Sequence, residues 1–300
     1  MTPAVRTVLG DIAPALLGVT DAHDHLFLAS RALPGQELDD TGAALTEIAA
    51  FAALGGRAVV QWTPWGMGRR ADALPDLSRR SGVHIVSATG LHQARHYEPA
   101  VLQDVRGGLA ELFVRELTEG TPRAGLIKVA GAFHHLDEHA RHVLAAAAEA
   151  HHVTDAPIGV HLEGGTAALD VLHVLCDVHG VPPHRVLLGH LHRFPDSEIH
   201  RQVAAASAFV ALDGPSRAHH ATDWRLLGAI AALVEGGHAD QVLLGGDTVT
   251  AAARSTAAGP GMPFLLSGLR PRIERELGTD VADAVFARNP ARAFAANWPA

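Results

Sequence analysis

The sequence is poor in several residue types, and each shortage excludes a class of protein. Cys176 is the only cysteine among 300 residues, so a disulfide within the chain is excluded. Lys and Arg total 24 against 32 Asp and Glu, which leaves a net charge of −8 and no basic stripe to bind a nucleic-acid backbone. No apolar run is as long as a membrane-spanning helix, and the first residues lack the apolar core of a secretory signal. We therefore expect a cytoplasmic protein that binds neither nucleic acid nor membrane.

Lysine is almost absent, because Lys128 is the only lysine among the 24 basic residues. A composition that favours Arg this strongly and keeps one Lys suggests a position that Arg cannot fill. Only an amine can lose its proton on burial and then react, whereas a guanidinium stays charged. Lys128 is therefore a candidate reactive group, and chance survival of one surface lysine is the alternative. Histidine occurs 21 times, so a single histidine is weak evidence of function.

Eight short apolar segments alternate with helical patterns along the chain. Their nearly continuous hydrophobicity is typical of parallel strands that are covered on both faces. Successive segments start one strand–helix unit apart, which predicts a (β/α)8 TIM barrel formed by residues 1–300 as one domain. A doubly wound open sheet is the alternative, although no G-x-G-x-x-G motif follows the first segment. The predicted strands are 17–23, 57–62, 83–88, 125–130, 157–161, 186–190, 209–213 and 242–247, and the clearest helical patterns are 42–54, 136–152, 166–179 and 224–235.

Potential metal ligands stand at the ends of these predicted strands. In a (β/α)8 barrel the carboxyl ends of all strands meet at one mouth, where catalytic residues gather. Five of the predicted strands bring histidine, lysine or aspartate to that mouth. These residues are His23 and His25 on the first strand, Lys128 on the fourth, His161 on the fifth, His190 on the sixth and Asp247 on the eighth.

The chemistry of these side chains favours a site for two cations. His23 and His25 are two residues apart on a strand and point to the same side, so both can bind one cation, and Asp247 adds an oxygen ligand. His161 and His190 suit a second cation nearby. A buried lysine that reacts with CO2 becomes a carbamate, whose two oxygens can bridge two cations. Each residue alone is explained by packing or hydrogen bonding, but the series in strand order favours a binuclear metal centre.

This series resembles that of the phosphotriesterase-like branch of the amidohydrolase superfamily, over essentially the whole chain. Within that branch the sequence is most similar to the members that hydrolyse sugar lactones, including phosphorylated furanose lactones. Stretches that carry the resemblance beyond the ligands are 10–14, 53–56, 68–70, 120–122, 156–158, 163–166, 189–190, 212–214, 246–248, 259–261 and 289–294.

The resemblance implies a ligand assignment. His23, His25 and Asp247 would hold the more buried cation, and His161 and His190 the more exposed one. Carbamylated Lys128 and a hydroxide would bridge the two. We expect zinc ahead of manganese or cobalt, all of which accept histidine and carboxylate ligands. The family also suggests a homodimer.

We predict from these observations a hydrolase that acts on a small-molecule carboxylic ester, above all a lactone. The bridging hydroxide would attack the carbonyl, and Asp247 would carry a proton toward the leaving oxygen. Hydrolysis of an N-acyl amide or a phosphotriester on the same metal centre is one alternative. A non-catalytic barrel that binds a ligand is another, of a different class.

Two departures from the family pattern bear on mechanism and substrate. Relatives commonly carry Asp two residues after the sixth-strand histidine, where this chain has His192. Either His192 relays protons instead, or the relay is absent. The loop after the eighth strand has Arg254 as its only cation, so we expect a neutral or apolar substrate portion ahead of a phosphate. Specificity is expected in loops 27–40, 91–99, 214–223 and 249–262, and the candidate substrate contacts are Leu91, His92, Tyr97, Arg217 and Arg254.

Overall fold

The centre of the molecule is a sheet of eight parallel strands, seen in a computed structural model that describes residues 2–214 and 223–299. Strands that are neighbours in the sheet follow one another along the chain, so the order never reverses as it does in a doubly wound sheet. The backbone N–H of Asp247 donates to the His23 carbonyl at 2.8 Å, which joins the last strand to the first. The predicted (β/α)8 barrel is confirmed. Its strands are β3 (Thr20–Asp24), β4 (Ala58–Gln61), β5 (His84–Thr89), β6 (Leu126–Ala130), β7 (Ile158–His161), β8 (Val186–Gly189), β9 (Phe209–Asp213) and β10 (Val242–Gly245).

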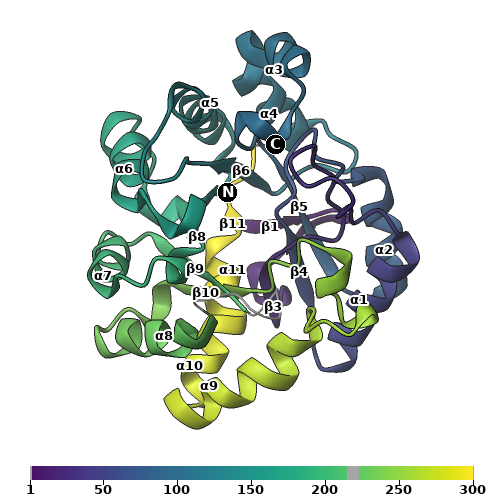
Figure 1. The fold of residues 1–300 in the computed structure, drawn as a ribbon, viewed down its shortest axis with the longest axis vertical. Coiled ribbons are helices and arrows are strands. Elements are labelled where there is room, and N and C mark those ends of the chain that lie inside the picture. The colour runs from purple at the N-terminus through teal and green to yellow at the C-terminus, as the bar shows by residue number, and fades with distance from the viewer. Residues whose placement is uncertain (1, 215–222, 300) are drawn as a thin grey trace.

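Helices surround this sheet on its outer side (Figure 1). They are α1 (Thr41–Ala53), α2 (Leu74–Ser81), α3 (Pro99–Val105), α4 (Leu109–Thr118), α5 (Glu138–Thr154), α6 (Ala168–Leu172), α7 (Ser197–Ala205), α8 (Leu226–Glu235), α9 (Arg270–Leu277), α10 (Thr279–Asp283) and α11 (Asn289–Ala293). The predicted helix 166–179 forms as α6, which continues directly into a π-helical stretch at His173–Val178. In the two described ranges no helix combines the length and the apolar character that crossing a membrane requires.

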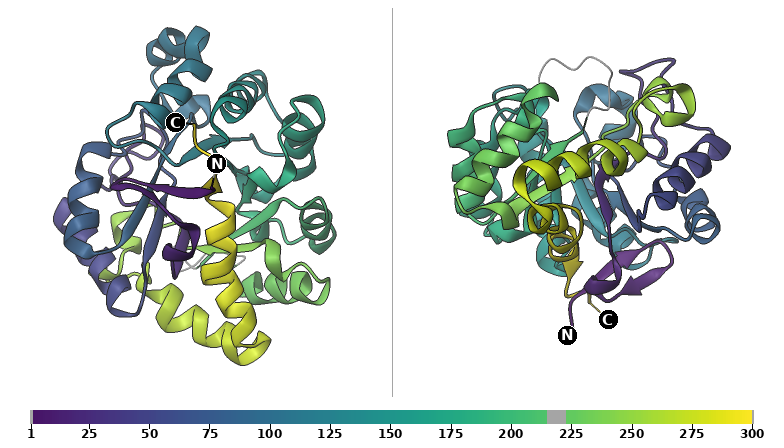
Figure 2. Two further views of the ribbon diagram at one scale, coloured as in Figure 1. Left: turned by 180° about the vertical axis from the view of Figure 1, so that it is seen from behind. Right: turned by 90° about the horizontal axis from the view of Figure 1, so that it is seen from below.

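A small antiparallel sheet lies at one end of the barrel. It consists of β1 (Ala4–Thr7), β2 (Gly10–Ile12) and β11 (Ala295–Ala296), and Val5 pairs with Ala295. Both chain ends therefore lie together at this end of the barrel (Figure 2). The loops that follow the strands are left to form the opposite end, where the predicted site residues lie.

The barrel interior is filled by side chains, with Trp62 directly below the predicted site. Its indole is fully buried, donates to the Ala22 carbonyl at 2.8 Å and stacks on the His23 ring at 4.0 Å between centroids. Gly159 and Gly189 make room for it, because a Cβ at either position would lie within 3.3 Å of the indole. Trp62 therefore fills the barrel interior below the site, and the His23 ring packs against it.

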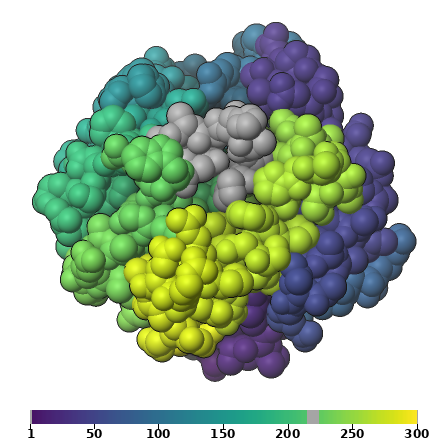
Figure 3. All heavy atoms as spheres, turned by 60° about the horizontal axis from the view of Figure 1, so that its bottom comes forward, coloured from purple at the N-terminus to yellow at the C-terminus, as the bar shows by residue number. Residues whose placement is uncertain are grey.

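The segment after β10 is anchored to the beginning of the chain (Figure 3). Arg254 is buried, and its guanidinium donates to the Leu26 carbonyl. The buried Glu47 carboxylate of α1 accepts hydrogen bonds from Ser255 Oγ at 2.7 Å and from the Met262 backbone at 2.9 Å. These contacts hold the loop that carries Asp247 and Val249 at the edge of the site.

Candidate metal centre

The six predicted metal ligands come together at the carboxyl ends of the strands. His23, His25, Lys128, His161 and Asp247 line one cavity of about 550 Å³. His190 is buried behind it, where its Nε2 lies 2.8 Å from Nδ1 of His161. His190 and Asp247 both adopt left-handed backbone conformations, with φ of 69° and 52°, at the turns that leave β8 and β10. Non-glycine residues adopt such conformations rarely, and they often do so at functional sites.

His23, His25 and Asp247 form the first group of candidate ligands. Nε2 of His23 and Nε2 of His25 lie 3.5 and 3.4 Å from the same oxygen, Oδ1 of Asp247. Their ligand atoms all lie within 4.8 Å of one another, and the three side chains are buried. Two imidazoles and a carboxylate are ordinary ligands for zinc and similar cations, so this donor set fits a divalent cation.

The tautomer of His25 follows from its neighbours. Thr63 Oγ1 donates to the Phe27 carbonyl at 2.6 Å, so its hydrogen is already used. The same oxygen lies 2.7 Å from His25 Nδ1 and must accept a hydrogen bond from it. The lone pair of the ring is therefore on Nε2, which faces Asp247. Burial lowers the pKa of His25, although Asp247 opposes the shift, so the ring is kept in the neutral form that binds metals.

Asp213, at the end of β9, connects the two groups of ligands. One of its oxygens lies 3.0 Å from Nδ1 of His23, and the other contacts Nδ1 of His190. Burial alone would raise the pKa of Asp213, but the His190 and His23 rings outweigh it and hold the pKa well below its usual value. A carboxylate at Nδ1 orients a histidine and leaves Nε2 available to a metal, as is common around metal centres. Our sequence reasoning gave Asp213 no role, although its place at a strand end was the available signal.

His161 and His190 form the second group. Their facing nitrogens, Nδ1 of His161 and Nε2 of His190, lie 2.8 Å apart, within hydrogen-bonding distance of each other. Burial lowers the pKa of His161 to about 4, and the pKa of His190 is also well below its usual value, chiefly through burial. Both rings are therefore neutral near pH 7 and have a lone pair to offer, which fits a second cation.

Lys128 lies on β6, lines the same cavity and is only 2% exposed. Burial lowers the pKa of its amine to about 7, even though the Asp247 and Glu163 carboxylates oppose this shift. A large fraction of the amine is therefore uncharged near neutral pH. An uncharged amine is the form that reacts with CO2, so the environment suits carbamylation.

Arg193 and Glu163 also line the cavity, and our sequence reasoning identified neither. Arg193 contacts Oδ2 of Asp247 and lies 3.5 Å from Oδ2 of Asp213. Glu163 accepts hydrogen bonds from Gln93 at 3.0 Å and Arg95 at 2.8 Å. The pKa of Glu163 is lowered to about 2 by its contact with His161 and by these two donors, although burial opposes the shift.

His192 is buried beside Asp213, whose backbone N–H lies 3.5 Å from its Nδ1. It is not among the described residues that line the cavity, whereas the next residue, Arg193, is. The turn Leu191–Arg193 explains this difference. It is a 3-10 helix, in which positions three apart share a face, so Arg193 lies on the same side as His190 and His192 does not.

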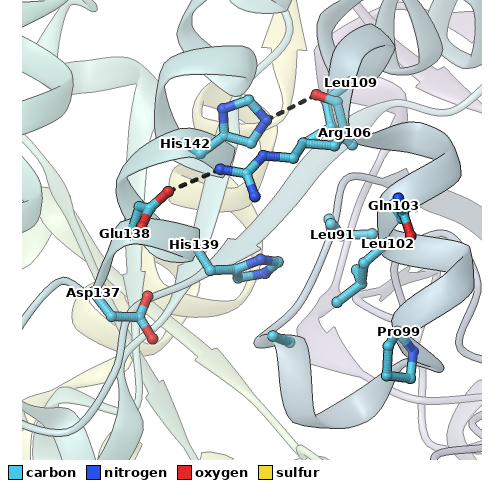
Figure 4. A pocket seen from close by; sticks show the side chains of 11 residues that line it. Leu91, Pro99, Leu102, Gln103, Arg106, Leu109, Asp137, Glu138, His139 and His142 are labelled. Carbon is cyan, nitrogen blue, oxygen red and sulfur yellow. Dashed lines mark hydrogen bonds and ion pairs between the residues drawn. The ribbon is translucent and has the colours of Figure 1, made fainter.

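The candidate substrate contacts are dispersed. His92 lines the cavity, and the Tyr97 hydroxyl, which accepts from the His92 backbone N–H at 2.8 Å, donates to the Trp65 carbonyl. Leu91 lines a neighbouring cleft between α3 and α5 (Figure 4). Arg254 is turned into the protein, as described above, and Arg217 lies outside the described residues.

Eight parallel strands whose carboxyl ends gather histidine and carboxylate ligands around one cavity define a (β/α)8-barrel hydrolase. The chain belongs to the phosphotriesterase family, whose model matches residues 3–294.

Individual relatives agree with this assignment. The structure of a lactonase from Listeria monocytogenes is 30% identical, superposes with a TM-score of 0.90 and covers 97% of this chain and 98% of its own. The phosphotriesterase homology protein of Escherichia coli, solved with phosphate in its active site, is 25% identical, has a TM-score of 0.86 and covers 93% and 99% of the two chains. A phospho-furanose lactonase of Mycoplasmopsis agalactiae is 28% identical over 73% of this chain and 69% of its own. The family resemblance noted from the sequence is confirmed.

Proposed function

We propose that this protein is a binuclear metal-dependent hydrolase that opens a lactone. The observation that carries the proposal is the position of Lys128, whose buried amine has a pKa of about 7 and lines one cavity with His23, His25, His161 and Asp247. The choice of a lactone is supported by the relatives, since a solved Listeria structure and a Mycoplasmopsis protein are both named lactonases.

Each side chain has a separate task in this proposal. His23, His25 and Asp247 would hold one cation, His161 and His190 would hold the other, and carbamylated Lys128 would join them. Such a pair of cations, of which zinc is the first choice and manganese or cobalt the alternatives, makes hydroxide available near neutral pH and polarises a carbonyl. Asp213 would keep Nε2 of His23 and His190 directed at the centre.

The charges of the cavity favour a lactone without a phosphate group. Arg254 is turned away and bonded to Leu26, so it brings no charge to the substrate. Arg95 and Arg193 are at the cavity, but each is paired with a carboxylate, Glu163 and Asp247 respectively. A neutral ring with hydroxyl or apolar substituents fits these surroundings better than a dianion.

A substrate panel on one preparation tests the proposal. The zinc-reconstituted protein is offered γ-lactones, N-acyl amino acids and an aryl phosphotriester, and ring opening or release of product is followed at pH 7.5. We expect the highest kcat/KM on the γ-lactones and loss of that activity after chelation. A higher kcat/KM on the amide or the phosphotriester would replace the lactone by that substrate. Equal activity with and without metal would overturn the metal-dependent mechanism.

A further inference from the structure

The two oxygens of Asp247 face different groups. Oδ1 lies 3.5 and 3.4 Å from Nε2 of His23 and His25, on the side of the first ligand group. Oδ2 contacts the guanidinium of Arg193 instead and lies 3.8 Å from Nδ1 of His190. The contact with Arg193 therefore leaves Oδ1 available as a ligand, and Arg193 and a cation need not compete for this carboxylate.

Arg193 is held in a fixed position at the cavity. It ends the short turn that begins directly after His190, and its guanidinium is bonded to Asp247 and lies 3.5 Å from Asp213. Its side chain is 16% exposed, and the exposed part lines the cavity together with Lys128 and His161. Two buried carboxylates thus hold a planar cation with several N–H donors beside the centre.

We propose that Arg193 is a catalytic residue that donates hydrogen bonds to the ring oxygen of the lactone, the oxygen that leaves. This role rests on the proposed lactonase function. Hydroxide adds to the carbonyl carbon, and the electron pair of the C=O bond moves to the carbonyl oxygen. When that bond forms again, the bond between the carbonyl carbon and the ring oxygen breaks and its electron pair stays on the ring oxygen. The proton of the added hydroxide ends on that oxygen, which leaves a carboxylate and an alcohol.

The charge that develops in the reaction makes the ring oxygen the target of Arg193. Arg193 and His190 both face Oδ2 of Asp213 and Oδ2 of Asp247, so the guanidinium lies beside the second ligand group. The cations would polarise the carbonyl oxygen, whereas the ring oxygen needs a donor of its own. Negative charge on the ring oxygen is greatest while the C–O bond breaks. A guanidinium that is already oriented stabilises this charge without reorganisation.

The test compares lactones whose leaving oxygens differ in basicity. Arg193→Met is measured on an alkyl γ-lactone, which leaves as a strongly basic alkoxide, and on a phenolic lactone, which leaves as a weakly basic phenolate. We expect kcat to fall by about 10²–10³-fold on the alkyl lactone, the loss typical when one such donor is removed. We expect a fall of less than about tenfold on the phenolic lactone, since its leaving oxygen needs less stabilisation. Bound zinc, measured by elemental analysis, should remain at the wild-type amount.

Arg185→Met is the matched control. Arg185 is similarly buried, 12% exposed, and pairs with Asp155 at 2.6 Å, but it lies before β8 and donates to the Ala295 carbonyl at the far end of the barrel. We expect this variant to keep the wild-type ratio of the two rates. Guanidinium ions added to Arg193→Ala should restore part of its activity on the alkyl lactone and none to Lys128→Ala.

Equal losses on the two lactones would overturn the role of Arg193, because they would mean that Arg193 only supports the site. A loss of bound zinc in Arg193→Met would also overturn it. If the wild-type protein opens neither lactone, the proposed function falls together with this role. If the wild-type protein opens both lactones and Arg193→Met keeps the wild-type ratio of the two rates, the proposed function stands and this role alone is refuted.

Discussion

At the scale of single residues, the site depends on which nitrogen of each histidine faces which partner. Asp213 lies at Nδ1 of His23 and of His190, and Thr63 lies at Nδ1 of His25. These contacts leave Nε2 of all three rings facing neighbouring candidate ligands. The orientation of the candidate ligands is therefore set by residues outside the predicted ligand set.

Asp213→Asn should weaken metal binding without removing a ligand. The amide has the shape of the carboxylate but can accept at only one position, so His23 and His190 would lose part of their orientation. We expect zinc affinity to fall by about 10–100-fold, as for other partners of metal-bound histidines. Competition with a chromogenic chelator measures it. Asp155→Asn, which removes a carboxylate paired with Arg185 far from the site, is the control, and equal zinc affinities of the two variants would contradict the role of Asp213.

Carbamylation of Lys128 should depend on pH in a direction that its pKa fixes. The folded-state pKa is lowered to about 7, so the ammonium dominates below pH 7 and the reactive neutral amine dominates above it. With ¹³C-bicarbonate and zinc, we expect the carbamate NMR signal and the rate of zinc uptake to rise between pH 6 and 8. His161 has a pKa of about 4 and does not titrate in this range. Lys128→Arg should give no carbamate signal, and zinc uptake that is constant or decreases over this range would contradict the prediction.

At the scale of elements, the loop after β10 is held by one buried carboxylate of α1. Glu47 accepts from Ser255 Oγ and from the backbone N–H groups of Ser255 and Met262. Gly261 has a φ of 57°, and a Cβ there would lie 1.9 Å from the Glu47 carboxylate, so only glycine allows this approach. The loop at the edge of the site is thus held against α1 by hydrogen bonds.

Glu47→Ala should loosen the loop after β10. Without the carboxylate, the backbone N–H groups of Ser255 and Met262 lose their buried acceptor, at a cost of about 1–3 kcal/mol each. We expect a lower free energy of unfolding in urea and faster hydrogen exchange confined to residues 251–262. Glu37→Ala is the control, because Glu37 is exposed and accepts from the Gly35 backbone N–H. Unchanged exchange in 251–262 would show that the loop is held by other contacts.

At the scale of the whole molecule, the candidate ligands come from distant parts of the chain. His23 and Asp247 are more than 200 residues apart, yet they lie side by side because β3 and β10 meet where the barrel closes. A cation bound to both would stabilise that closure, since the unfolded chain cannot hold these ligands together.

Removal of metal should therefore destabilise the entire barrel. At a free zinc concentration 1,000 times its Kd, binding contributes about 4 kcal/mol to the free energy of unfolding. We expect a higher Tm for the zinc-loaded protein than for the chelated one, with a smaller difference in Asp213→Asn at the same zinc concentration. Calorimetry measures both differences. A Tm that is independent of zinc would contradict the metal centre.

The barrel and the strand ends that carry the six candidate ligands could be predicted from the sequence pattern. Parallel strands covered on both faces have near-continuous apolar runs, and their carboxyl ends must meet at one mouth, so residues such as His161 and Lys128 could be placed from strand ends alone. The hydrophobic pattern is sufficient to place these residues because every strand–helix unit of the barrel has the same geometry.

The neighbours of these candidate ligands could not be predicted, because they depend on how distant segments pack together. The expectation for His192 came from its position two residues after His190, where relatives carry Asp. The chain turns left-handed at His190 and continues as a 3-10 turn, and Arg193 lines the cavity. Arg254 is turned inward because the Leu26 carbonyl offers it a partner more than 200 positions away. Contacts of this kind depend on backbone turns and on distant groups, and neither is recorded in the local sequence.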